Sequence, residues 1–430
     1  MIKLEGETMT ATETKSVVTC DLEGRIETFN AGAESIFGYA ADEVVGKKRV
    51  SLFSPGLVVL GHVGHWLSEA RDKGSFETTT VFVRKDGTRF AAEITIRPTR
   101  RDGEHIGYCG ITVPRPDLSP EEASPPAKLG TRIFSWLVVA RAPFLTATLV
   151  PVLVGAGLVA SGQPGPFPWA LFALTLVGAF ALQVAANTFN DYFDWRSGTD
   201  EGNNDYFMPF SGGSRSIELR LVTPRRLLFV AWTATLLSAS TGVVLVTHAG
   251  WGILLFGLVG ALSAYFYTAP PLRLAARKGL GELVVGLNFG PLMVAGTVYA
   301  LVGHVTWVHF FAGLPVGLLT TAILWVNEFP DAESDERAGK LNLVVVLGTR
   351  AARWGYLALV AGAALLVVSG VVTQTLPVGA LLFLLAAPLG VFATVVLFRH
   401  YGSRRLVRAN AATIQLHLLS GLCLALGLCL

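Results

Sequence analysis

Charged residues are scarce in this chain of 430 residues, and their scarcity excludes several classes of protein. They make up 15% of the sequence, where an ordinary globular domain carries about 25%, and hydrophobic residues make up 52%. Such proportions exclude a disordered or fibrous protein and argue against an enzyme that is soluble throughout. The formal net charge is only +3, so bulk charge gives no case for nucleic-acid binding, and we expect no nucleic-acid partner.

Cysteine is also rare, with four residues in the whole chain: Cys20, Cys109, Cys423 and Cys429. They have neither the spacing of a metal site nor that of a disulfide framework. This usage fits a reducing compartment or burial in a membrane. The first 15 residues, MIKLEGETMTATETK, contain no apolar run, so we expect no cleavable signal peptide.

The sequence divides into two parts of different composition. The first 115 or so residues are mixed and charged, with alternating runs such as VFVRKDGTRFAAEITIRP (81–98). This alternation is typical of half-buried strands, and Asp86-Gly87 between its two runs predicts a hairpin turn. Residues 114–128 contain five prolines and several charges, a composition that cannot bury a core. We therefore expect a first domain at 14–115, a linker at 116–130 and a second domain at 131–430.

The second domain consists of apolar segments, each close to the roughly 20 residues that cross a bilayer. They predict an all-α membrane bundle of about nine transmembrane helices, so that the chain as a whole is a multidomain membrane protein. The nine segments lie near 136–160, 168–189, 226–247, 250–268, 280–303, 306–326, 352–373, 376–397 and 410–430.

Lysine and arginine are distributed unevenly among the connections of this bundle. The connections after the second, fourth, sixth and eighth segments carry essentially all of them, and those after the odd-numbered segments carry none. The positive-inside rule then places the N-terminal domain and the even-numbered connections in the cytoplasm.

Two of the cytoplasmic connections begin with acidic motifs. In AANTFNDYFDWRSGTDEGNND (185–205), Asn190 is followed four residues later by Asp194, and in WVNEFPDAESDERAGK (325–340) Asn327 is followed by Asp331. Spacings of three or four residues put such side chains on one helix face. The motifs are four segments apart, which suggests an internal duplication. Further carboxylates accompany them: Asp191 and Asp200 in the first, Asp335 in the second.

Carboxylates gathered at one membrane depth repel one another unless something binds them. Hard divalent cations relieve that repulsion, and Mg²⁺ is typically held by one or two carboxylates together with substrate phosphates. Two such clusters facing one cavity would hold a diphosphate between two metal ions. Arg215, Arg277 and Lys340 would neutralise the remaining phosphate charge. The alternatives are cytoplasmic loops that are merely solvated, and a proton relay or ion pathway, whose carboxylates usually lie deeper in the helices.

The two motifs carry a family resemblance. Residues 131–430 resemble the UbiA superfamily of intramembrane prenyltransferases, with NDYFDWRSGTD (190–200) similar to its first Asp-rich motif and NEFPDAESDERAGK (327–340) to its second. Within it, three stretches resemble the 1,4-dihydroxy-2-naphthoate polyprenyltransferase branch of menaquinone synthesis. They are RAPFLTATLVPVLVG (141–155), PFSGGSRSIE (209–218) and YTAPPLRLAARKGLGELVVG (267–286).

The resemblance implies a set of site residues. Catalytic and metal-binding roles would fall to Asp191, Asp194, Asp331 and Asp335, and Asp200 would be a further metal ligand in place of the Asp that the commonest motif has at Gly198. The substrates would be bound by Asn187, Asn190, Asn327, Arg141, Arg215, Tyr265, Tyr267, Lys340 and Arg277, or by Lys278 beside it. The implied cofactor is Mg²⁺, with two ions, and the implied substrates are a polyprenyl diphosphate and an aromatic acceptor.

The reaction would need positive charge beside the diphosphate and a pocket that excludes water. Mg²⁺ withdraws charge from the diphosphate as the allylic C–O bond breaks, and the resulting prenyl cation needs a pocket that excludes water. Tyr265, Phe266 and Tyr267 would offer aromatic faces to the cation, or would serve only helix packing and the interfacial belt. A carboxylate or the released diphosphate would remove the ring proton.

Residues 14–115 resemble a PAS domain, a small α+β fold. VVTCDLEGRIETFNAGAESIFGYAADEVVGK (17–47) matches its first strands and helices, and FVRKDGTRFAAEITIRPTRRDGEHIGYCGITV (82–113) its last three strands. Its ligand is unknown: His62 and His65 lie where some PAS domains place a haem ligand, but an isolated His is usually structural. A sensory role and a homodimer through this domain both stay open.

The leading interpretation is an integral membrane enzyme, in the plasma membrane of a bacterium or archaeon, that prenylates 1,4-dihydroxy-2-naphthoate under control of a PAS domain. One alternative changes the acceptor to 4-hydroxybenzoate, homogentisate, a chlorophyllide or a lipid. The other is a membrane sensor that binds an isoprenoid or quinone without turnover, although the intact Asp clusters argue against it.

Overall fold

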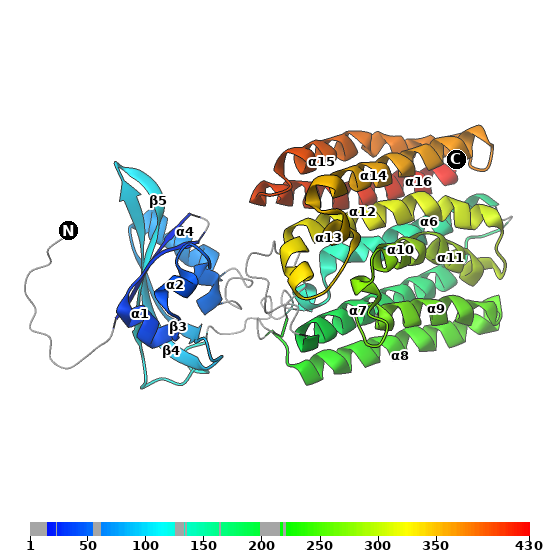
Figure 1. Cartoon of the computed structure of the whole chain (residues 1–430). Coiled ribbons are helices and arrows are strands. Elements are labelled where there is room, and N and C mark those ends of the chain that lie inside the picture. The colour runs from blue at the N-terminus through cyan, green and yellow to red at the C-terminus, as the bar shows by residue number, and fades with distance from the viewer. Residues whose placement is uncertain are drawn as a thin grey trace, which may run out of the picture. The chain divides into compact units, whose positions relative to one another are not determined.

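The computed structural model describes residues 15–22, 24–54, 62–124, 133, 136–162, 165–197, 216–217 and 221–430. The chain divides into two compact units, 1–135 and 136–430 (Figure 1).

A five-stranded antiparallel sheet forms the N-terminal unit, with the strands in the order β2-β1-β5-β4-β3. Its long hairpin confirms the turn predicted at Asp86-Gly87: Val83 pairs with Arg89, and Asp86 Oδ1 accepts a hydrogen bond of 2.8 Å from the Thr88 amide. The elements are β1 (Ser16–Asp21), β2 (Ile26–Phe29), α1 (Ala31–Phe37), α2 (Ala41–Val44), η1 (Val50–Phe53), α4 (His62–Lys73), β3 (Phe76–Val83), β4 (Arg89–Arg101) and β5 (Glu104–Pro114).

Local capping fixes the segment between β2 and α2. Asn30 Oδ1 accepts hydrogen bonds from the Ala33 amide at the start of α1 and from the Val17 amide of β1, so one side chain caps the helix and ties it to the sheet. Gly38 ends α1 with φ of +77°, a left-handed conformation that favours glycine. The buried rings of Phe37 and Phe53 stack with centroids 4.1 Å apart at the centre of this core.

The first nine residues of the predicted linker, 116–124, are described by the structure, and part of them packs against the sheet of the first unit. Ala123 is buried against Val81 and Ala91 of the sheet, with Leu118 packed beside it. Arg89 donates a hydrogen bond to the Ser124 hydroxyl. The prolines at these positions permit compact turns, and the two apolar side chains between them attach 116–124 to the sheet of the first unit.

The second unit is built from helices. In chain order they are η2 (Ala142–Leu145), α6 (Thr146–Gly162), α7 (Trp169–Ser197), α8 (Pro224–Ala249), α9 (Gly252–Phe266), η3 (Leu274–Ala276), α10 (Leu280–Leu287), η4 (Asn288–Leu292), α11 (Met293–Val302), α12 (Trp307–Arg337), α13 (Leu343–Leu347), α14 (Thr349–Val372), η5 (Val378–Ala386), α15 (Ala387–His400), η6 (Arg404–Leu406) and α16 (Val407–Leu428).

Within the described residues, eight spans are long and apolar enough to cross a membrane, and α9 is a shorter apolar helix of 15 residues. Together they correspond to the nine predicted segments. The main difference is that α7 continues to Ser197 and α12 to Arg337, well past the apolar stretches near 168–189 and 306–326. The acidic motifs therefore lie on the helices themselves, whose polar faces keep the helical hydrogen bonding beyond the apolar part.

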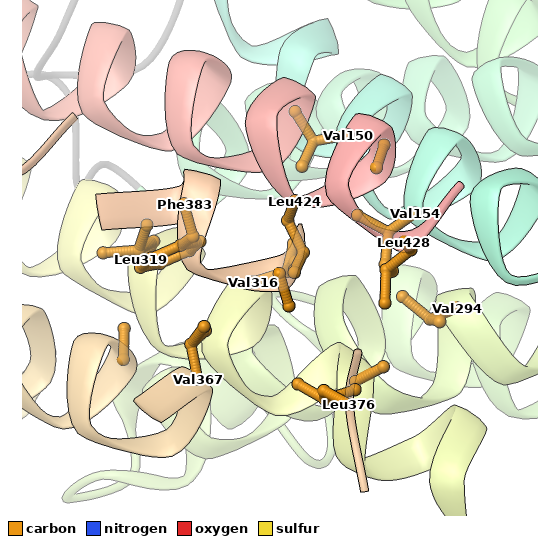
Figure 2. Packing of buried hydrophobic residues seen from close by; sticks show 14 of the residues in the cluster. Val150, Val154, Val294, Val316, Leu319, Val367, Leu376, Phe383, Leu424 and Leu428 are labelled. Atoms are coloured by element: carbon orange, nitrogen blue, oxygen red, sulfur yellow. The ribbon is translucent and has the colours of Figure 1, made fainter. Parts of the chain in front are cut away.

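The main core of this unit joins helices from both ends of the sequence. Val150 and Val154 of α6 meet Leu424 and Leu428 of α16, and Val316 of α12 lies in the same cluster (Figure 2). Contacts of this kind, between residues more than 250 positions apart, hold the bundle closed around α12.

A glycine seam, defined here as Gly286, Gly290, Gly313 and Gly317, joins the span α10–η4–α11 to α12. The span is interrupted at Gly290, whose φ of −119° and ψ of −105° are not helical, and Pro291 follows. A Cβ added at Gly317 would lie 2.2 Å from the Gly286 carbonyl oxygen, and one at Gly290 would lie 2.6 Å from the Gly313 oxygen. The two backbones are therefore in direct contact, which only glycine permits.

Candidate active site

A cavity of about 260 Å³ lies among α6, α7, α9, α10, η4, α11 and α12. Its polar lining comes mainly from the last turns of α7 and α12. Its apolar lining comes from earlier turns of the same helices, such as Ala179 and Leu182 on α7 and Ile323 and Leu324 on α12. The cavity therefore has a charged region that continues into an apolar one.

The first motif contributes Asn187, Asn190 and Asp194 to the cavity. Their spacings of three and four residues place them on one face of α7, as predicted. Asp191 is not among the lining residues. It is 3% exposed and forms an ion pair with Arg141, and it accepts a hydrogen bond of 3.4 Å from the Ser216 hydroxyl. Its negative charge is thus balanced within the protein.

Amide side chains hold this face of α7 in place. Asn187 donates a hydrogen bond of 3.0 Å to the Ala140 carbonyl and accepts one of 3.1 Å from Gln183. Gln183 in turn accepts a hydrogen bond from the Thr148 hydroxyl of α6. Arg141, which precedes α6 and has φ of +52°, also donates to Asn190 Oδ1. The first motif is therefore fastened to the segment that begins the bundle.

The second motif contributes Asn327, Asp331 and Asp335 to the same cavity. Asp335 is 4% exposed; its Oδ2 accepts a hydrogen bond of 2.8 Å from Asn342 and lies 3.6 Å from the Lys340 ammonium nitrogen. Asn327 accepts a hydrogen bond of 2.6 Å from Asn410 of α16. The structure thus brings both predicted motifs together on one cavity.

Lys340 follows α12 and supplies a positive charge to the cavity lining. Burial by itself lowers the pKa of its ammonium group, but the carboxylates of Asp335 and Asp194 raise that pKa further, and the net result lies above the ordinary value. The group therefore stays charged at neutral pH. A short backbone strap fixes it: the Lys278 amide donates to the Leu341 carbonyl at 2.7 Å, and Glu282 accepts from the Leu343 amide at 2.6 Å.

Several predicted residues lie elsewhere. Tyr267 lines the cavity, but Tyr265 does not: its ring packs against Phe189 and Trp232, so the packing alternative describes its position. Arg277 donates hydrogen bonds to the Leu272 and Pro271 carbonyls of its own loop and does not line the cavity. The two remaining predicted residues, Asp200 and Arg215, lie outside the described residues.

Comparison with known proteins decides the family. The model of the UbiA prenyltransferase family matches residues 148–419, more than half of the chain. The chain belongs to this family. A PAS domain model matches residues 14–113, so the N-terminal unit is a PAS domain.

Relatives of this UbiA-family protein cover the same part of the chain. The 1,4-dihydroxy-2-naphthoate octaprenyltransferase of Mycobacterium tuberculosis is 33% identical over 275 residues, which are 63% of this chain and 89% of that protein. The 2-carboxy-1,4-naphthoquinone phytyltransferase of Synechocystis is 28% identical over 317 residues, 72% of this chain and 96% of that protein. A UbiA homolog from Archaeoglobus fulgidus, solved with GPP and Mg²⁺, matches with a TM-score of 0.51 and 18% identity over 68% of this chain and 98% of its own. At that identity the likeness shows the fold alone.

The donor set of the UbiA-family cavity fits Mg²⁺ that is shared with a phosphate ligand. Among the described residues, no group of three or more His, Cys, Asp or Glu side chains is arranged to hold a metal ion by protein ligands alone. One or two carboxylates with substrate oxygens are the usual ligands of Mg²⁺, and Asp194, Asp331 and Asp335 line the cavity on two facing helices. These oxygens fit a metal that arrives with its diphosphate.

Glu328 is not among the predicted site residues, yet it lines the cavity and is 7% exposed. The sequence carries a signal for it, because Glu328 directly follows Asn327 and stands in the place that Asp191 takes after Asn190. Asn410 and Asn288 are also absent from the predicted set. Asn288 lines the cavity and donates a hydrogen bond of 3.1 Å to Ser263 across to α9, and single amides inside apolar segments carry no motif that would single them out.

A second cavity, of about 70 Å³, lies inside the PAS domain and is lined mostly by apolar side chains. Cys20, Ser54 and Tyr108 also line it. His62 and His65 are not among its lining residues. His62 instead lies near the Trp66 ring, and His65 near Phe76. Their position gives no support to a haem ligand.

Proposed function

We propose that this protein transfers a polyprenyl group from its diphosphate to an aromatic acceptor of the 1,4-dihydroxy-2-naphthoate type. The observation that carries the proposal is the single cavity in which the carboxylates of α7 and α12 meet an apolar lining. A polyprenyl diphosphate has the same division, with a highly charged head and a hydrocarbon chain.

The names of the two curated relatives support the choice of acceptor. One is named for octaprenyl transfer to a dihydroxynaphthoate and the other for phytyl transfer to a carboxynaphthoquinone. Both names therefore describe a bicyclic aromatic acceptor and a long isoprenoid donor, which is the pairing we propose here.

Each cavity residue has a proposed part in binding the diphosphate. Asp194, Asp331 and Asp335 would hold two Mg²⁺ ions, with Asp200 as a further ligand, and each bound ion would supply positive charge for the departing diphosphate. Lys340, Asn190 and Asn327 would bind phosphate oxygens directly, with Arg215, Arg277 and Arg141 as further positive charges around them. Asn187 and Asp191 would keep this group of side chains in place.

The apolar part of the cavity has a separate task. The allylic cation that forms when the C–O bond breaks reacts with water unless water is kept out. Leu182, Ile323 and Phe289 line this part and provide that exclusion. The Tyr267 ring lies on the same cavity and offers an aromatic face that stabilises positive charge.

The placement of the protein in its cell is part of the proposal. The protein is an integral membrane protein, and the lysine and arginine asymmetry supports a cytoplasmic position for the PAS domain and for both acidic motifs. We further propose that the PAS domain regulates the transferase, acting as a sensor or through a homodimer.

One experiment tests the activity. The purified protein is incubated with Mg²⁺, a polyprenyl diphosphate and a panel of acceptors that includes 1,4-dihydroxy-2-naphthoate, 4-hydroxybenzoate and homogentisate, and products are identified by mass spectrometry. We expect the prenylated naphthalene product to dominate. Preference for another acceptor would replace the acceptor in the proposal, and the absence of any product would reject the enzyme in favour of a non-catalytic sensor.

A further inference from the structure

Glu328 is a buried carboxylate on the cavity that the diphosphate site does not explain. It is 7% exposed and lines the cavity from α12. Its Oε2 is fully buried and has no hydrogen-bond partner in the described part of the chain. A buried carboxylate oxygen without a partner is costly, and a ligand that donates a hydrogen bond is one explanation for such a group on a cavity.

The position of Glu328 along α12 sets it apart from the proposed metal ligands. Asp331 and Asp335 follow it by one and two helical turns, Asn327 lies directly before it, and the lining residues one turn earlier, Leu324 and Ile323, are apolar. With a rise of about 1.5 Å per residue, Glu328 lies about 4.5 Å along the helix from Asp331. Together with Asn327 it therefore marks the boundary between the charged and the apolar parts of the cavity.

The reacting carbon of the donor must lie at the same boundary. That carbon joins the diphosphate, which the charged part would bind, to the hydrocarbon chain, which the apolar part would bind. The ring that attacks it must come within bonding distance, so the acceptor also lies near Glu328.

The surroundings of Glu328 favour a neutral hydrogen-bond donor. The carboxylates of Glu282, Asp335 and Asp331 act on it together, opposed by Lys340, so a ligand carboxylate or phosphate oxygen at this point would add to the repulsion. Two cations line the cavity among the described residues, and both already have carboxylate partners: Lys340 pairs with Asp335, and Arg141 pairs with Asp191. A hydroxyl group of a ligand would donate a hydrogen bond to the Glu328 carboxylate oxygen and would add no charge.

We propose that Glu328 accepts a hydrogen bond from a ring hydroxyl of the aromatic acceptor and so selects hydroxylated rings and fixes their orientation. The inference rests on the proposed function and adds the residue that recognises the acceptor. The hydrogen bond also increases the electron density of the ring, which makes its carbon a better nucleophile towards the prenyl group.

The test compares Glu328→Gln with a matched control on the same helix, Glu333→Gln. Glu333 is exposed, pairs with Arg337 and does not line the cavity. The readouts are the KM for 1,4-dihydroxy-2-naphthoate, the KM for the polyprenyl diphosphate, the Mg²⁺ concentration for half-maximal rate, and the Ki of 2-naphthoate, which lacks ring hydroxyls.

We expect Glu328→Gln to raise the acceptor KM about tenfold or more, since hydrogen bonds to charged groups are among the stronger ones. The diphosphate KM, the Mg²⁺ requirement and the Ki of 2-naphthoate should change by less than about threefold, and Glu333→Gln should leave all four unchanged within the same limit. A shift in the diphosphate KM or Mg²⁺ requirement would assign Glu328 to the metal site and overturn the inference. A parallel rise in the acceptor KM and the Ki of 2-naphthoate would indicate a change of cavity shape and would overturn it as well.

The wild-type protein provides a second test that needs no folded variant. At least one of 1-hydroxy-2-naphthoate and 4-hydroxy-2-naphthoate should inhibit about tenfold more strongly than 2-naphthoate. Equal inhibition by all three would overturn the role of Glu328 while leaving the prenyl transfer in place. Absence of turnover with every acceptor would instead reject the proposed function itself.

Discussion

The acidic motifs of α7 and α12 begin alike, with Asn190-Asp191 and three residues later Asp194 in one, and Asn327-Glu328 and three residues later Asp331 in the other. The first and last members of each triplet line the cavity in both helices. The middle members differ. Asp191 is turned to Arg141 and Ser216, whereas Glu328 faces the cavity and has a carboxylate oxygen without a hydrogen bond among the described residues.

The residues that contact a motif therefore decide what each carboxylate does, more than the sequence of the motif itself. Arg141 precedes α6 and pairs with Asp191, so we propose that this carboxylate fixes the structure. In the second motif Lys340 is paired with Asp335, and Glu328 Oε2 has no hydrogen-bond partner among the described residues, so we propose that it binds a ligand. On this proposal the middle position of two similar motifs anchors the structure in one and binds substrate in the other.

The largest expected effect comes from the members that the two motifs share. Asp194→Asn and Asp331→Asn should each lower the rate of prenyl transfer about 100-fold or more, because each removes a charge that stabilises the metal and the diphosphate. The rates are measured by mass spectrometry on protein whose folding is checked by gel filtration. A rate near that of the wild type in either variant would contradict the proposal that both motifs bind the metal and the diphosphate.

A smaller effect on rate is expected for the middle member of the first motif. Asp191→Asn leaves the half-buried Arg141 without its charged partner, which should cost about 2 kcal/mol of stability and lower the rate only about tenfold. The double variant Arg141→Gln, Asp191→Asn should be more stable than Asp191→Asn alone, as measured by thermal unfolding in detergent. If Asp191→Asn is as stable as the wild type but inactive, Asp191 is a ligand of the metal and the two motifs are equivalent after all.

Removal of the PAS domain should change the rate by less than about threefold, because both motifs lie in the second unit and the family match lies wholly within it. A protein that begins near Ala127 retains every cavity residue named here. The measurement is the rate of prenyl transfer with and without the first 126 residues. A truncated protein that is folded and inserted in the membrane but inactive would show that the PAS domain is part of the working enzyme.

Single introduced cysteines can test whether the two motifs lie on the same side of the membrane. We expect these substitutions to leave the rate of prenyl transfer unchanged. Cysteines replacing the exposed Arg196, at the end of α7, and Glu336, at the end of α12, should both react with an impermeant maleimide from the cytoplasmic side. One replacing His304, before α12, should react only from the other side. The background is a protein without its four native cysteines. Labelling of Arg196→Cys and Glu336→Cys from opposite sides would show that the two motifs do not lie on the same side of the membrane.

Much of this arrangement could be predicted from the sequence, and the reasons are local. Apolar runs of about 20 residues predict spans, and Asp86-Gly87 predicts a hairpin, because both signals act over a few neighbouring residues. The pairing of Arg141 with Asp191 joins residues 50 positions apart and has no local signal. The same is true of Asn410, which fixes Asn327 from a helix 83 positions further on.

For other features the sequence left alternatives open, because two physical explanations fit one residue or segment. Tyr265 and Tyr267 are two positions apart in one aromatic cluster of the sequence, yet only Tyr267 lines the cavity, because residues two apart on a helix face different directions. The prolines of 114–128 predict a linker, but Ala123 and Leu118 find a small apolar surface on the PAS sheet. Composition describes the average of a segment, and two side chains are enough to attach part of it.

The glycine seam between α10–η4–α11 and α12 has a consequence for anyone who wishes to alter the range of substrates. A side chain of any size at Gly317 or Gly290 meets backbone atoms, which cannot rotate away, so one wall of the cavity cannot be rebuilt without separating two helices. The lining from α7 and α9 is more tolerant: a Cβ at Gly260 of α9 would meet only the end of the Leu182 side chain, at 2.9 Å. Libraries for longer donors or larger rings should therefore vary α7 and α9 and leave the seam untouched.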